Sequence, residues 1–159
     1  MCLPRSVSTT LSIGLLAVSL ALSAAAHAHS GPPTEPNKPQ NPDYIAGERA
    51  IQTKDWAVAI GYFSRLTGDR EYAANAYNWM GYAERQQGHL DAAFGNYNKA
   101  LELDPKHRGA HEYVGEAYLM AGNVAKAEEH LAILDKLCFF GCEEYSELKK
   151  KIADYKRKG

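Results

Sequence analysis

Residues 81–105, GYAERQQGHLDAAFGNYNKALELDP, contain the pattern that decides the fold. Small residues stand at fixed places in this stretch, and equivalent residues recur 34 positions earlier and later in the chain. The recurring glycines are Gly47, Gly81 and Gly115, and the recurring alanines are Ala59, Ala93 and Ala127. The same spacing relates Phe63, Tyr97 and Leu131, and also Leu66, Ala100 and Leu134. A period of this length is typical of stacked helical hairpins, so the sequence predicts three copies of one hairpin.

Apolar residues in the same stretch follow the spacing of one helical face. They are Leu90, Ala93, Phe94, Tyr97, Ala100 and Leu101. Their separation by three or four positions is that of an amphipathic helix packed on a neighbour. Gly88 and Gly122 permit tight turns between helices, and Pro105 ends the helix before it. No alternating apolar run is long enough to suggest a sheet. The sequence predicts helices over residues 43–52, 55–66, 74–86, 90–103, 107–120, 124–137 and 143 to about 157.

The repeated residues resemble the tetratricopeptide repeat (TPR) family. The matching positions are Tyr77, Met80, Gly81, Gly88, Ala93, Tyr97, Ala100 and Pro105. Residues 40–73 form the weakest copy, because Lys54 replaces the turn glycine and Glu71 stands where the second copy has Pro105. The second copy also departs from the family, because Glu84 stands where an aromatic residue is usual. The resemblance implies an all-α fold, a right-handed superhelical array of about three TPR hairpins. The hairpins would lie at about 40–73, 74–107 and 108–141, with their helices spanning residues 43–137.

The last predicted helix, residues 143–158, is interpreted as a C-terminal capping helix. A stack of hairpins exposes an apolar face at its end, which an element with a polar outer side must cover. The apolar stripe of this helix consists of Tyr145, Leu148, Ile152 and Tyr155. We interpret Lys149, Lys150 and Lys151 as a solvated face, with a site for an acidic partner as the alternative.

The first 42 residues differ in composition from the rest. Arg5 precedes a mostly apolar stretch that ends in small residues, which is typical of a secretory signal peptide over residues 1–28. Cleavage could follow Ala26 or Ala28. Residues 29–42 are rich in proline and poor in apolar residues, so they are expected to form a disordered linker. The sequence therefore predicts a periplasmic or secreted protein with no membrane segment after signal cleavage.

The TPR resemblance also implies a place for a partner. In this family the first helix of each hairpin lines a concave groove that receives an extended peptide or a partner helix. The 34-residue register selects nine groove residues: Tyr44, Glu48, Ile51, Asn78, Tyr82, Arg85, Glu112, Glu116 and Leu119. Some family members bind a terminal carboxylate with lysine, arginine and asparagine, and only Asn78 matches in kind. Because Glu112 and Glu116 would repel an acidic tail, we expect a basic or mixed apolar partner segment that contacts Tyr82 and Leu119.

Two cysteines remain after the leader, Cys138 and Cys142, in the sequence CFFGC. In an exported chain this spacing suggests a disulfide that fixes the corner before the last helix. Two other interpretations stay open. A strained, exposed bridge would be easily reduced and could be redox-active, and paired thiolates could bind copper(I).

The histidines allow a second metal hypothesis. If cleavage follows Ala26, the chain begins His27-Ala28-His29, which could bind copper(II) or nickel(II) through its amine, amides and imidazole. His107 and His111 are four positions apart and could share a helical face. No carboxylate pair completes a metal site beside them, so we interpret both as surface histidines and predict no metal site and no cofactor.

Composition and motifs exclude several function classes. The formal net charge of −1 gives no general reason to expect a nucleic-acid partner. No serine elbow, phosphate-binding glycine loop or zinc-protease motif is present, so we predict no catalytic residues. The leading hypothesis is a non-catalytic protein-protein interaction module, a TPR adaptor or assembly factor for a protein or peptide partner. The alternative is a metal or thiol-redox accessory protein using Cys138 and Cys142. A homodimer that buries the end of the first hairpin also stays open.

Overall fold

The computed structural model describes residues 41–158, which form seven helices and no strand. The predicted signal peptide and the predicted linker up to residue 40 lie outside the described residues. The helices are α1 (Pro42–Gln52), α2 (Trp56–Ser64), α3 (Ala73–Gln86), α4 (Leu90–Leu103), α5 (Arg108–Met120), α6 (Val124–Leu137) and α7 (Glu143–Lys158). The predicted all-α fold is confirmed.

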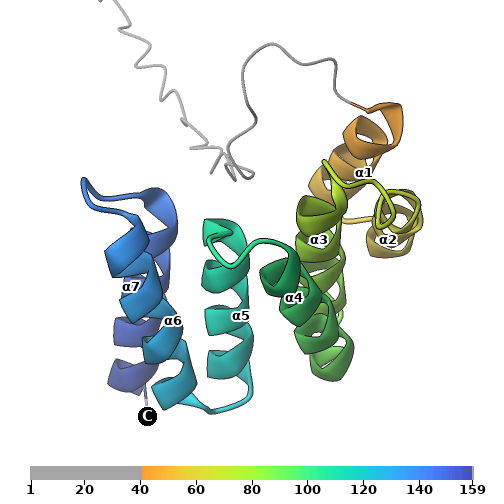
Figure 1. The fold of residues 1–159 in the computed structure, drawn as a ribbon. Coiled ribbons are helices and arrows are strands. Elements are labelled where there is room, and N and C mark those ends of the chain that lie inside the picture. Colours follow the sequence, from red (N-terminus) through yellow and green to blue (C-terminus); the bar gives the residue numbers. More distant parts are fainter. Residues whose placement is uncertain (1–40, 159) are drawn as a thin grey trace, which may run out of the picture.

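The helices are stacked in chain order. Each one packs on the next, and α5 also packs on α3 and on α7. Figure 1 shows the resulting row, with the α1–α2 hairpin at one end and α6 and α7 at the other. Because each hairpin contacts only its neighbours, the stability of such an array is approximately a sum of hairpin and interface contributions. None of the helices described is both long and apolar enough to span a membrane.

The recurring glycines lie where aromatic rings press against the first helix of a hairpin. A Cβ atom on Gly81 would lie 2.6 Å from the Tyr97 ring, and one on Gly47 would lie 2.7 Å from the Phe63 ring. Only glycine leaves room for these rings, which are fully buried. Gly115 differs from the other two glycines, because it faces an aliphatic side chain and not an aromatic ring. A Cβ atom on Gly115 would lie 2.7 Å from Leu148 of α7.

The turns inside the hairpins need a left-handed backbone conformation. Gly88 and Gly122 adopt it with φ values of 81° and 76°, and Lys54 adopts it in the first hairpin with φ 60°. Glycine populates this region without steric cost, whereas other residues do not. The weak first copy of the repeat therefore keeps the turn geometry but carries a strained residue there.

The ends of the array are closed differently. At the start, the Asn41 side chain accepts a hydrogen bond from the Asp43 backbone, and Pro42 occupies the first turn of α1. The helix thus begins at a residue that the sequence had assigned to the linker. At the far end, α7 covers α5 and α6 with Leu148 and Ile152, which are buried with Leu119, Ala127 and Leu134. This is the packing expected of a capping helix.

Candidate partner-binding site

Most of the residues predicted to line a groove are buried in this structure. Those buried are Tyr44, Ile51, Asn78, Arg85, Glu112, Glu116 and Leu119. Glu48 and Tyr82 are partly exposed. Tyr44 has a structural contact, because its hydroxyl accepts a hydrogen bond of 3.1 Å from Trp79 Nε1 across the first two hairpins. Ile51 and Leu119 belong to the two apolar cores.

Arg85 and Glu116 form the centre of a chain of charges. Arg85 Nη1 of α3 lies 2.7 Å from Glu116 Oε2 of α5, and Lys151 Nζ of α7 lies 2.5 Å from Glu116 Oε1. Arg85 Nε also donates a hydrogen bond of 3.2 Å to the Tyr97 hydroxyl, and its guanidinium lies over the Tyr82 ring at 5.3 Å. These ion pairs connect α3, α5 and α7. The charges of Arg85 and Glu116 are therefore already compensated within the protein.

This chain of charges corrects two interpretations made from the sequence. Glu116 does not present an unpaired negative charge to a partner, because it is held between Arg85 and Lys151. Lys151 does not belong to a purely solvated lysine face. Sequence reasoning could not find the Lys151 contact, since α7 lies outside the 34-residue register that aligns the hairpins.

Glu112 differs from Glu116 because it has no hydrogen-bond or ion-pair partner among the described residues. Its side chain is nevertheless buried, with 9% of its surface exposed. Burial raises the pKa of this carboxyl group to about 8, and the negative charge of Glu116 adds to the effect, while Lys151 and Arg85 oppose it. At neutral pH Glu112 is therefore mostly protonated and uncharged.

Asn78 is also buried without partners. None of its surface is exposed, and neither its Oδ1 nor its Nδ2 atom has a hydrogen bond within the described part of the chain. Nδ2 faces α5, where it lies 3.4 Å from the position that a Cβ atom on Gly109 would occupy. Gly109 is one helical turn from Glu112. An unsatisfied buried polar group costs roughly 1–3 kcal/mol, so this amide needs a functional or structural explanation.

The interpretation of His107 and His111 as surface residues is wrong. Both are buried. His111 Nε2 donates to the Pro105 carbonyl at 3.1 Å, which leaves Nδ1 to accept from His130 Nδ1 at 2.9 Å. His107 Nδ1 accepts from the Ala110 backbone, and its Nε2 donates to Asn75 Oδ1 at 2.8 Å. Burial lowers the pKa of all three imidazoles, that of His130 to about 4, so the cluster is neutral.

The predicted disulfide joins Cys138 and Cys142, whose Cα atoms are 5.5 Å apart. Within residues 41–158, no three histidine, cysteine, aspartate or glutamate side chains are grouped so that they could hold a metal ion. The histidine motif at residues 27–29 lies outside the described residues. Redox activity of the cysteine pair stays a prediction.

Comparison with known proteins supports the fold. A family model described as TPR repeat matches residues 81–122, and no curated protein matches the sequence. The TPR2B domain of yeast Sti1, solved in a complex with pHsp70, is similar with a TM-score of 0.65 at 19% identity, over 74% of this chain and 95% of that one.

Two further solved structures are similar in fold. The Yersinia enterocolitica type III secretion chaperone SycD, solved with a peptide of the translocator YopD, has a TM-score of 0.60 at 21% identity and covers 71% of this chain and 86% of its own. PcrH, solved with the chaperone-binding region of PopB, has a TM-score of 0.59 at 18% identity, with 71% and 90% covered. Residues 81–122 therefore match a TPR repeat, and the described residues have the fold of an all-α TPR-type array closed by a C-terminal helix.

Proposed function

We propose that this protein is a non-catalytic adaptor or assembly factor that acts in the periplasm or outside the cell. It binds a segment of another protein along α3 and α5. Two lines of support are independent of each other. The three similar structures each hold a protein or peptide partner, and the leader-like composition of residues 1–28 favours export.

The observation that carries the proposal is the pair of unsatisfied groups on neighbouring helices. Arg85 and Glu116 are paired within the protein, whereas Asn78 and Glu112 are not. A lysine or arginine side chain from a partner would supply the counter-ion that Glu112 lacks. Because Asn78 is fully buried, amides of the same segment would satisfy it only after α3 and α5 move apart on binding. The partly exposed Tyr82 beside them provides an aromatic contact of the kind that anchors interfaces.

A peptide-display selection on the full exported chain tests this proposal. Peptides enriched on the protein should carry a lysine or arginine next to apolar residues, and replacing that basic residue with glutamine should weaken binding about tenfold or more. Glu112→Gln should have a similar effect. Glu102→Gln, which removes an exposed carboxylate from α4, is the matched control and should bind like the unmodified protein. Enrichment of acidic C-terminal tails that still bind Glu112→Gln would refute the proposal.

Calorimetry with a selected peptide gives a second readout. Because Glu112 is mostly protonated at pH 7, formation of an ion pair with a basic side chain should release a proton. Binding enthalpies measured in two buffers of different ionisation enthalpy should therefore differ, and the difference should vanish in Glu112→Gln. Equal enthalpies in both buffers for the unmodified protein would show that Glu112 stays protonated and takes no part.

A further inference from the structure

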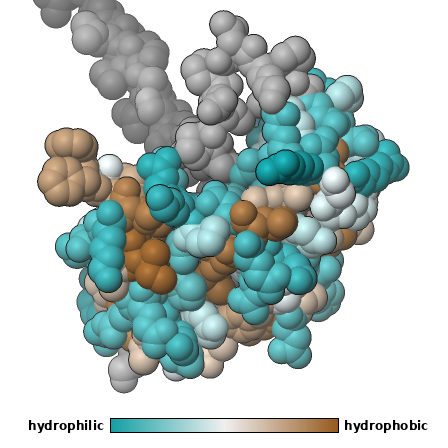
Figure 2. All heavy atoms as spheres, viewed as in Figure 1, coloured by the Kyte–Doolittle hydropathy of each residue, from teal (hydrophilic) through white to brown (hydrophobic). Residues whose placement is uncertain are grey.

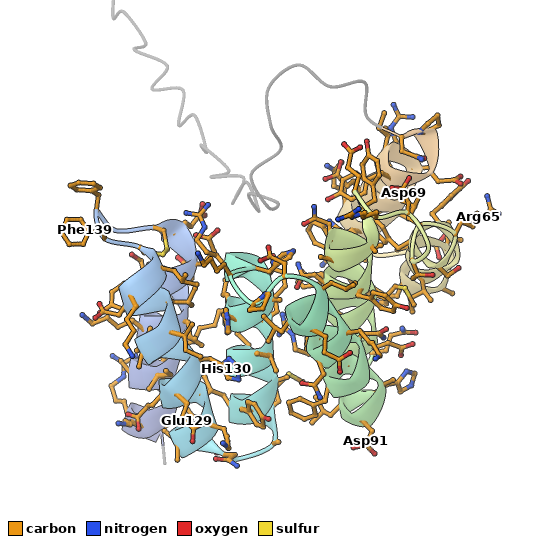
Figure 3. All side chains as sticks on the ribbon, viewed as in Figure 1. Arg65, Asp69, Asp91, Glu129, His130 and Phe139 are labelled. Carbon is orange, nitrogen blue, oxygen red and sulfur yellow. A yellow bond between two sulfur atoms is a disulfide. The ribbon has the colours of Figure 1, made fainter. Side chains whose placement is uncertain are left out.

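The two most exposed large apolar side chains of the described residues are adjacent. Phe139 and Phe140 are 86% and 97% exposed, whereas Leu103 and Met120, the next in order, are 54% exposed. Figure 3 shows Phe139 pointing away from the helices. In Figure 2 the loop between α6 and α7 forms a light-brown projection at the left, clear of the surface around it. Burying a phenylalanine contributes about 1.5–3 kcal/mol, so this exposure forgoes stability that folding could otherwise gain.

The loop is held in place at both ends. Cys138 and Cys142 are joined by the disulfide, the Gly141 amide donates to the Cys138 carbonyl at 2.8 Å, and α6 and α7 pack against each other. The two phenylalanine rings contact each other edge to face, with centroids 5.0 Å apart. A closed ring between two packed helices loses little freedom when it docks, and this preorganisation favours binding.

The charges beside the loop decide what kind of surface it fits. Glu143 and Glu144 lie in the first turn of α7, and Glu147 follows one turn later. Arg108 lies 3.5 Å from Glu144, and Lys136 lies in the last turn of α6, so these two cations offset part of the negative charge of the three glutamates. An anionic lipid surface would be repelled by this acidic turn. Two copies of the chain meeting through this loop would bring like charges together. A protein pocket with lysine or arginine at its rim complements both the rings and the carboxylates.

We propose that the Cys138–Cys142 loop is a second docking site, which inserts Phe139 and Phe140 into an apolar pocket with a basic rim on a partner protein. The site lies on the α6–α7 corner, separate from the α3–α5 surface. The protein can therefore hold a client segment on one face while the loop attaches it to another protein. This inference does not depend on the function proposed for α3 and α5.

Site-specific photo-crosslinking in cells that produce the full chain tests the loop. The photoreactive residue p-benzoylphenylalanine replaces Phe139, and in a matched control it replaces Leu103, an exposed apolar residue of α4. We expect a protein adduct from position 139 that position 103 does not form. Mass spectrometry should place the cross-link in an apolar segment flanked by lysine or arginine. In extracts, the yield should fall as salt is raised, because the acidic turn contributes to attraction.

Two variants separate docking from stability. Phe140→Ser removes an almost fully exposed ring, so it should leave the melting temperature unchanged. It should lower the cross-link yield about tenfold, because loss of an aromatic anchor weakens an interface by about this factor. Cys138→Ser with Cys142→Ser should lower the yield as well, by freeing the loop. Glu112→Gln should not change the yield, so failure of the α3–α5 proposal would leave this result intact. Mainly lipid adducts, adducts between two copies of the chain, equal yields from both positions, or an unchanged yield in Phe140→Ser would each overturn the inference.

Discussion

At the scale of single residues, the unusual feature is a buried amide that makes no hydrogen bond. We predict that Asn78→Leu will raise the free energy of unfolding by about 1–3 kcal/mol, because it replaces an unsatisfied buried polar group with an apolar side chain of similar size. The same variant should bind a selected peptide more weakly. Chemical denaturation and a binding titration measure the two effects. Asn75→Leu is the contrasting control, since it breaks the hydrogen bond to His107 and should lower stability. A less stable Asn78→Leu protein would mean that the amide has a partner in the folded state.

Glu112 makes stability depend on pH in one direction. Its pKa is about 8 in the folded protein and 4.5 in its ordinary state, so folding takes up a proton between these values. Stability from this group is full below about pH 4.5 and is lost as the pH rises toward 8, by up to about 1.4 kcal/mol per pH unit. Glu112→Gln should flatten this loss in denaturation curves recorded from pH 5 to 8. Parallel curves for the two proteins would contradict the burial effect on Glu112.

The histidine cluster makes stability depend on pH in the opposite direction. The pKa of His130 is lowered from 6.5 to about 4, so unfolding takes up protons when the pH falls through this window. The stability contributed by the neutral cluster is present above about pH 6.5 and is lost toward pH 4. His130→Gln should reduce the loss, as measured by thermal melting from pH 7 to 4. His89→Gln, which removes an exposed histidine paired with Glu84, should keep the full loss.

At the scale of elements, the first hairpin turn carries a strained residue. Lys54 has φ 60° where the other hairpins use Gly88 and Gly122. We predict that Lys54→Gly will stabilise the protein by up to about 1 kcal/mol, because the left-handed conformation costs a non-glycine residue roughly 1–2 kcal/mol and glycine loses more entropy on folding. Denaturant unfolding measures the change. Gly88→Ala is the reciprocal control and should destabilise. A loss of stability in Lys54→Gly would show that the lysine side chain has a compensating contact.

At the scale of the whole molecule, the charges of Arg85, Glu116 and Lys151 join the second and third hairpins to the cap. We predict that Lys151→Met will destabilise the protein by about 1 kcal/mol, a modest value because the lysine is partly solvated. In a nearest-neighbour array the effect should be local. Hydrogen exchange should therefore increase in α7 and α5 and stay unchanged in α1 and α2. Lys150→Met, at the exposed neighbouring position, should change neither. An equal increase across all helices would contradict the local effect.

Much of the fold could be predicted because it depends on local patterns. Predicted helix ranges agree with α4 and α6 at both ends and with the other helices within two residues. The 34-residue period identified Gly81 and Tyr97 as recurring positions, and the structure places them in contact. The candidate site was harder to predict. The 34-residue register identifies which residues share a helix face, but it does not say which of them face a neighbouring helix at close range.

The sequence by itself determined the array: the period of small residues, the turn glycines and the amphipathic last helix specify hairpins that stack and a helix that caps them. Only the tertiary structure decided which polar groups are satisfied. His111 is buried with α6 bringing His130 against it, and His107 is buried with Asn75 of α3 as its partner. The negative charge of Glu116 is compensated because α3 and α7 each supply a cation. Asn78 and Glu112 receive no such partner. Helix formation follows from spacing within one segment, whereas hydrogen bonds and ion pairs depend on the distance between side chains of different segments, which packing alone sets.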